Sequence, residues 1–227
     1  MRIRSFIIAY ALVLAILLFA DRRPSPNTQD RYSHVVDLTD VPGIVPKADP
    51  QDGVAQNALS TAESRTRIVA PDALIPGTWT AGQIPPERLV APLVVMDLNI
   101  SPTASSQISI DDIAAWETQH GAVPQGAVVA IRHAGSSALS STALPITADA
   151  ARFLMDARYS TGFVFETPAD FSADRALARQ VALHGNYVVE GTARLSALPA
   201  TGSLIIVAPA KDKRAGRTPV RVLAMVK

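Results

Sequence analysis

The sequence predicts an α/β domain, a mixed β-sheet with packed helices, preceded by a hydrophobic N-terminal helix. A near-continuous apolar run at 89–98 is typical of a strand that is buried on both faces. Further along, two segments with helical spacing of apolar residues, 109–120 and 147–157, alternate with short apolar segments that are typical of strands. The third observation is an uncharged apolar run at 6–20.

Residues 1–20 are predicted to be either a signal peptide or a membrane anchor. Arg2 and Arg4 precede the apolar run, which as a helix spans about 22 Å, compared with about 30 Å for the hydrocarbon core of a bilayer. This length fits both a cleaved export signal and an anchor that crosses the membrane through residues 5–20. Either alternative places the domain outside the cytoplasm, as an exported, periplasmic or otherwise extracytoplasmic protein that is free or anchored in the cytoplasmic membrane.

Residues 21–31 are polar and contain two prolines, which predicts a flexible linker, and residues 32–227 form the predicted domain. The first strand is expected at 33–39. An irregular loop follows at 42–64, then a short strand at 67–69, a proline-rich turn containing Pro76-Gly77 and Pro85-Pro86, and the buried strand at 89–98.

The helix at 109–120 is predicted from Ser109 as its N-cap, acidic residues in its first turn, and Gly121 at its end. The helix at 147–157 begins at Thr147 in the same way. The remaining expected elements are strands at 127–132 and 161–168, a helix at 173–183, a strand at 186–190, and two closing strands at 202–210 and 216–226.

Composition excludes several kinds of site. The chain has 21 Lys and Arg residues against 20 Asp and Glu residues, a net charge of +1, and no basic run, so no nucleic-acid partner is expected. It has no cysteine, which excludes disulfides and thiolate metal sites. No two of its four histidines have the i, i+4 spacing of a helical metal site, so any metal would need ligands from distant segments.

The segment 63–73 resembles the signature H-x-G-T-H-x-D-x-P-x-H of the cyclase family, which includes kynurenine formamidase (arylformamidase) and similar metal-dependent hydrolases. Thr66 and Pro71 stand where the motif has threonine and proline, and Gly216 to Arg221 read as the Gly-x-x-Pro-Val-Arg marker of the family. The resemblance covers about 35–226 and implies the fold of that family. The four motif positions that supply metal ligands and a catalytic histidine hold Glu63, Arg67, Val69 and Ala73, and Arg65 replaces the glycine of the motif.

The second half of the family's site has changed as well. The resemblance implies a glutamate, present as Glu190, and a histidine twelve residues earlier, where this chain has Ala178. We therefore expect that the family metal, zinc or manganese, is not bound. The expected pocket consists of Glu63, Thr66, Arg67 and Glu190, and we hypothesise that Arg67 replaces the missing cation by pairing with Glu190.

Three functions stay open. The first is a catalytically degenerate homologue that binds a small anionic ligand. The second is an active amidase or lactone hydrolase with an unusual site, for which His133 and His184 are the weak catalytic candidates. The third is a structural or partner-binding domain held at a membrane. The family resemblance also implies a homodimer.

Overall fold

The computed structural model describes residues 32–40, 65–98, 107–133, 144–166, 174–211 and 216–227. The predicted apolar segment 1–20, the linker 21–31 and the predicted loop at 42–64 lie outside these ranges, so they stay predictions. In the part of the chain that is described, no helix combines the length and the apolar character needed to span a membrane. Residues His34–Lys227 form one compact unit.

Eight strands form one mixed sheet. They are β1 (His34–Asp37), β2 (Arg67–Val69), β3 (Val90–Leu98), β4 (Val128–His133), β5 (Gly162–Phe165), β6 (Tyr187–Glu190), β7 (Ser203–Pro209) and β8 (Arg217–Val226). The described helices are α3 (Pro71–Leu74), α4 (Pro86–Leu89), α5 (Ile110–His120), α6 (Ala148–Ala157) and α7 (Arg175–Leu183), with 3-10 turns η2 (Ala81–Gln83) and η3 (Leu195–Ala197). The predicted mixed sheet with packed helices is thereby confirmed.

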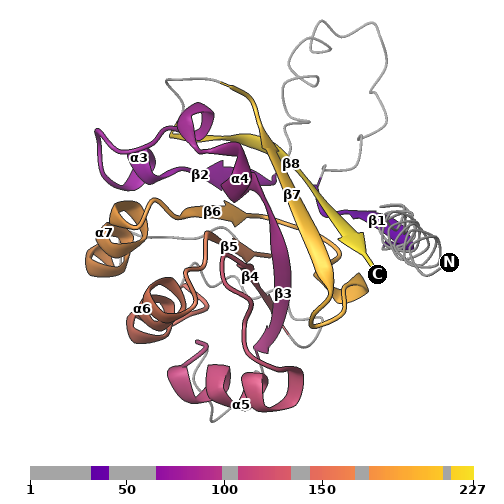
Figure 1. The fold of residues 1–227 in the computed structure, drawn as a ribbon. Coiled ribbons are helices and arrows are strands. Elements are labelled where there is room, and N and C mark those ends of the chain that lie inside the picture. The colour runs from indigo at the N-terminus through magenta and orange to yellow at the C-terminus, as the bar shows by residue number, and fades with distance from the viewer. Residues whose placement is uncertain (1–31, 41–64, 99–106, 134–143, 167–173, 212–215) are drawn as a thin grey trace, which may run out of the picture. The chain divides into compact units, whose positions relative to one another are not determined.

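The strand order is β1-β8-β2-β6-β5-β4-β3-β7, and β7 also pairs with β8, so that the sheet closes on itself (Figure 1). Strands β3, β4, β5 and β6 are parallel to their neighbours in this series. Their carboxyl ends therefore meet at one edge, which is where ligands bind in many α/β sheets. Strand β2 is antiparallel to β6 and begins at that same edge.

Helices α5, α6 and α7 cover one face of the curved sheet, as Figure 1 shows. Side chains alternate between the two faces along each strand. Val69 and Val188 pack in the core under the helices, whereas Ile68, Tyr187 and Val189 pack in the core on the opposite face. Because Arg67 and Glu190 each lie two residues from Val69 and Val188, their side chains belong to the helix-covered face.

Helix α5 begins as the sequence predicts. The Ser109 side chain accepts a hydrogen bond from the backbone N–H of Asp112, and the Asp112 carboxylate accepts one from the backbone N–H of Ser109, which is a capping box. The segment between β2 and β3 differs from the expected proline-rich turn, because it contains α3, η2 and α4. Pro71 and Pro86 stand at the first positions of α3 and α4, where a missing backbone N–H is tolerated.

Candidate functional site

The candidate site is built around β2, which lies between β6 and β8. Arg67 stands directly opposite Glu190 of β6 and Pro219 of β8. Residues directly opposite each other in a ladder share a face of the sheet. Arg217 of β8 is opposite Val69, two residues along β2, and therefore projects to the same face. Strand register thus brings Arg67, Glu190 and Arg217 together at the edge where the parallel strands end.

The carboxylate of Glu190 is buried and bonded to the guanidinium of Arg217. Glu190 is 2% exposed, whereas the Arg217 side chain is 48% exposed. The Nε–H of Arg217 donates to Oε1 of Glu190 at 2.8 Å, and an Nη2–H donates to the same oxygen. Arg217 therefore reaches across β2 and supplies a positive charge to a carboxylate that has almost no contact with solvent.

Thr66 lies next to this ion pair and has a structural role, because its hydroxyl is hydrogen-bonded to backbone groups. Its side chain is fully buried, and its hydroxyl donates to the carbonyl of Gly191 at 2.7 Å and accepts from the backbone N–H of Asp40 at 2.7 Å. One hydroxyl therefore joins the segment after β1, the segment before β2 and the end of β6. The backbone uses the only donor of the hydroxyl and one of its two acceptor positions.

The described residues do not fit the metal of the family that the sequence resembles. A zinc site needs about three or four nitrogen, oxygen or sulfur ligands from the protein. At the corresponding positions Val69 and Ala178 are apolar and buried, and Ala73 lies against the backbone of Gly216. The described ranges contain no group of three or more His, Cys, Asp or Glu residues that could hold a metal ion. Glu63 lies outside those ranges.

The two candidate histidines lie apart. His133 is the last residue of β4, opposite Leu98 of β3, and its side chain lies outside the described part. His184 follows α7, where its Nδ1 is 2.8 Å from the carbonyl oxygen of Gln180 and its Nε2 is 2.8 Å from Oδ1 of Asp156. Both ring nitrogens of His184 therefore lie beside hydrogen-bond acceptors, a backbone carbonyl and a carboxylate.

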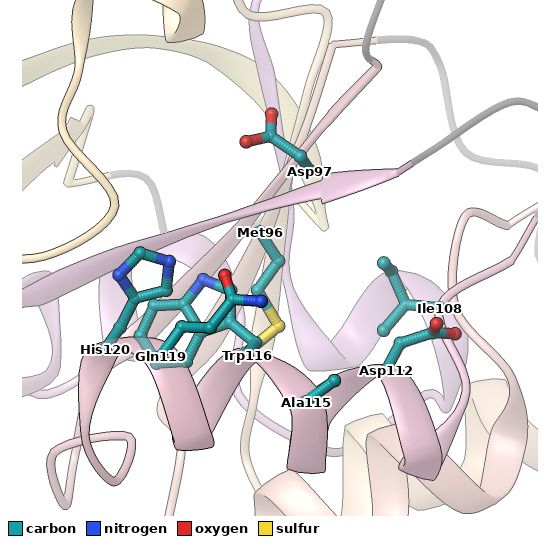
Figure 2. A pocket seen from close by; sticks show the side chains of 8 residues that line it. All are labelled: Met96, Asp97, Ile108, Asp112, Ala115, Trp116, Gln119 and His120. Carbon is teal, nitrogen blue, oxygen red and sulfur yellow. The ribbon is translucent and has the colours of Figure 1, made fainter.

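One pocket beside α5 has a volume of about 270 Å³ and is lined by Met96, Asp97, Ile108, Asp112, Ala115, Trp116, Gln119 and His120. Figure 2 shows Trp116, Gln119 and His120 next to one another on the helix, with Asp97 on the strand across from them. The carboxylate of Asp97 accepts two hydrogen bonds from Arg132, at 2.5 and 2.8 Å, and these raise the pKa of Arg132. Asp112 caps its own helix. The charged groups of this pocket are therefore already engaged.

Another pocket, also of about 270 Å³, lies at the far end of α7, lined by Gly77, Thr78, Trp79, Ala182, Leu183, His184 and Gly185. The ring of Trp79 packs so closely over Gly185 that a Cβ there would lie 2.8 Å from it. The guanidinium of Arg88 lies 5.8 Å from the Trp79 ring centre. The Trp79 ring therefore lies close to both Gly185 and Arg88.

Arg217 is the residue that sequence reasoning missed. It stands at the first variable position of the Gly-x-x-Pro-Val-Arg marker, whose own arginine is Arg221, so the marker identified the closing strand and gave no reason to single out Arg217. The sequence-based hypothesis named Arg67 as the partner of Glu190, whereas the guanidinium described on this carboxylate is that of Arg217. Nothing local in the sequence shows that β8 lies next to β2, and only this pairing brings Arg217 to Glu190.

Comparisons with known proteins give a consistent result. A family model described as a putative cyclase matches residues 21–170. The chain is 28% identical over 164 residues to an isatin hydrolase of Roseibium aggregatum; the match covers 62% of this chain and 61% of that relative, less than two thirds of its length.

Among solved structures, isatin hydrolase A from Labrenzia aggregata, bound to benzyl benzoate, has a TM-score of 0.63 and 27% identity, and the match covers 85% of this chain and 93% of that one. A potential metal-dependent hydrolase with cyclase activity has a TM-score of 0.60 at 22% identity, covers 86% of this chain and 98% of that one, and supports the fold alone.

Proposed function

Since the chain belongs to the putative cyclase family, we propose that it is a catalytically silent homologue of the family's hydrolases which keeps the fold and a small-molecule site but binds no metal. The observation that carries this proposal is the ion pair between the buried carboxylate of Glu190 and the half-exposed Arg217. In a metal-dependent relative, the equivalent carboxylate has to be available as a ligand. Here its oxygen accepts two guanidinium N–H groups.

Electrostatics supports the absence of a metal. The guanidinium of Arg217 keeps its charge at any physiological pH. A divalent cation about 4 Å from it would be repelled by about 8 kcal/mol at an effective dielectric constant of about 20. The apolar side chains at Val69, Ala73 and Ala178 offer no ligand atoms that would offset this repulsion. Hydrolysis by a metal-bound water would thus lack both its ion and its ligands.

Metal content and turnover test the proposal together. We expect purified protein, after incubation with zinc or manganese and removal of free ions, to contain far less than one metal per chain. We also expect no hydrolysis of isatin above the buffer rate. One metal per chain, or turnover that a chelator abolishes, would refute the proposal. Arg217→Gln serves as a matched variant, and we expect it not to bind metal either, because the missing ligands are not restored.

A second candidate is an active hydrolase of cyclic amides or lactones, supported by the 27–28% identity to isatin hydrolases. His133, at the carboxyl end of β4, and His184, which follows α7, are its histidine candidates. Turnover of isatin or a lactone that persists with chelator and is lost in His133→Gln would favour this alternative.

The proposed domain organisation is a signal peptide or anchor at 1–20, a linker at 21–31 and the cyclase domain at 32–227, in a protein that acts outside the cytoplasm. Fractionation of cells that express the full chain or a form lacking 1–20 tests this. Equal amounts of both forms in the cytoplasm would refute the export proposal. A homodimer is proposed on the family resemblance alone, and sedimentation at several concentrations tests it.

A further inference from the structure

Arg217 uses only one edge of its guanidinium to hold Glu190. A guanidinium carries five N–H donors in a planar fork, and the edge formed by Nε and Nη2 is directed at one carboxylate oxygen. The second edge, formed by Nη1 and the other hydrogen of Nη2, has no acceptor among the residues that the structure describes. Two parallel N–H groups on this edge match the two oxygens of a carboxylate.

The open edge is both accessible and held in place. Half of the Arg217 side chain is exposed, whereas Glu190 is buried. The buried partner therefore fixes the plane of the guanidinium, and a ligand need not immobilise a free arginine side chain. A group oriented before binding costs the complex less conformational entropy.

The charges around Arg217 favour an anion. A carboxylate on the open edge lies next to the guanidinium, while the carboxylate of Glu190 lies beyond it on the other edge. Because Coulomb energy falls with distance, attraction to the nearer cation exceeds repulsion from the farther anion. Arg67 belongs to the same face of the sheet by strand register.

We propose that the open edge of Arg217 binds the carboxylate of a small organic acid in a two-pronged hydrogen-bonded pair. This inference rests on the proposed function, because it requires that Arg217, and no metal, occupies the Glu190 site. It names the ligand class of that site: monocarboxylates, bound by an arginine from the closing strand.

Titration of the full chain with sodium benzoate tests this proposal by calorimetry and by thermal stabilisation. Benzamide, which has the same ring without the charge, and sodium chloride at equal ionic strength are the controls. We expect benzoate to bind with a dissociation constant of about 1 mM, and the controls to have no effect. Benzoate that stabilises the protein no more than benzamide or chloride would overturn the proposal.

Three variants locate the binding. Arg217→Gln is expected to weaken benzoate binding at least about tenfold, and Arg217→Lys about threefold or more, since lysine keeps the charge but lacks the fork. Arg221→Gln is the matched control, because Arg221 lies on the same strand, is 69% exposed and makes one contact with Asp37. Unchanged affinity in Arg217→Lys, which keeps a cation beside Glu190, would refute the assignment even if Arg217→Gln fails to fold.

The two proposals fail in different ways. Stoichiometric metal in the protein would refute the proposed function and this inference with it. A protein without metal or turnover that does not bind benzoate would refute this inference and leave the absence of catalysis intact.

Discussion

Replacing Arg217 with glutamine is expected to destabilise the domain, because the carboxylate of Glu190 would stay buried without this cation. Two unit charges about 4 Å apart attract by about 4 kcal/mol at an effective dielectric constant of about 20. Breaking a fully buried ion pair by removing one partner costs about 3–5 kcal/mol. The Arg217 side chain is 48% exposed, so solvent screens part of the interaction. We therefore expect a loss of about 2 kcal/mol.

Urea unfolding of four proteins measures this loss: wild type, Arg217→Gln, Glu190→Gln and the double variant. In a domain of this size, a loss of about 2 kcal/mol lowers the melting temperature by about 4–8 °C. Glu190→Gln removes the buried charge and leaves an arginine that water can solvate, so its loss should be smaller. The double variant is expected to be more stable than Arg217→Gln alone, because no buried charge is left.

These four proteins form a double-mutant cycle. Its coupling energy separates the interaction between Arg217 and Glu190 from the other contacts that Glu190 makes. We expect a coupling of about 1–2 kcal/mol. Strictly additive losses, or an Arg217→Gln protein within about 0.5 kcal/mol of the wild type, would show that Arg217 does not neutralise Glu190 in solution.

Three further changes have expected outcomes. Thr66→Val should lower the free energy of unfolding by about 1–3 kcal/mol, because it leaves the buried carbonyl of Gly191 without its hydroxyl donor. Thr66→Ser keeps the hydroxyl and should lose less stability. Equal urea unfolding curves for the two variants would contradict this. Gly191→Ala should destabilise the domain by more than about 1 kcal/mol, because the residue has φ +66° and an added Cβ would lie 2.5 Å from the carbonyl oxygen of Arg65. An unchanged melting temperature would contradict this backbone geometry. The hydrogen bonds from Arg158 hold the pKa of Glu117 below its usual range. This pair therefore stabilises the folded domain fully above the pKa of Glu117 in the unfolded chain, about 4.3, and the stabilisation is lost as the pH falls through the pKa of Glu117 in the folded domain. Melting temperatures of wild type and Glu117→Gln should therefore differ at pH 7 and converge as the pH falls through the lowered pKa of folded Glu117, and a gap independent of pH would refute the assignment.

Local signals in the sequence predicted the elements that local physics controls. Helix α5 follows from Ser109 and the acidic first turn, and β3 follows from its apolar run, because capping and burial act over a few residues. The short helices α3 and α4 were not expected. Proline was taken as a sign of a turn, but Pro71 and Pro86 begin helices.

The candidate site was predicted only in part, because its central contact joins distant strands. Comparison with a family motif pointed to Arg67 and Glu190, which the register places opposite each other. The ion pair of Glu190 depends on the position of β8, and spacing along the chain carries no information about that position. The closure of the sheet by β7 and β8 was not predicted for the same reason, since strand pairing is a property of the whole sheet.

The place of β2 in the sheet has a consequence for biosynthesis. The two strands that pair with β2 are β6 and β8, which are among the last to be made, and Arg67 lies opposite Glu190 and Pro219. At a ribosomal rate of about 5–20 residues per second, β2 waits on the order of ten seconds with both edges unpaired. Contacts so distant in sequence slow folding, and open strand edges favour aggregation. Strand β2 is therefore exposed to edge-to-edge association until β6 and β8 have been made.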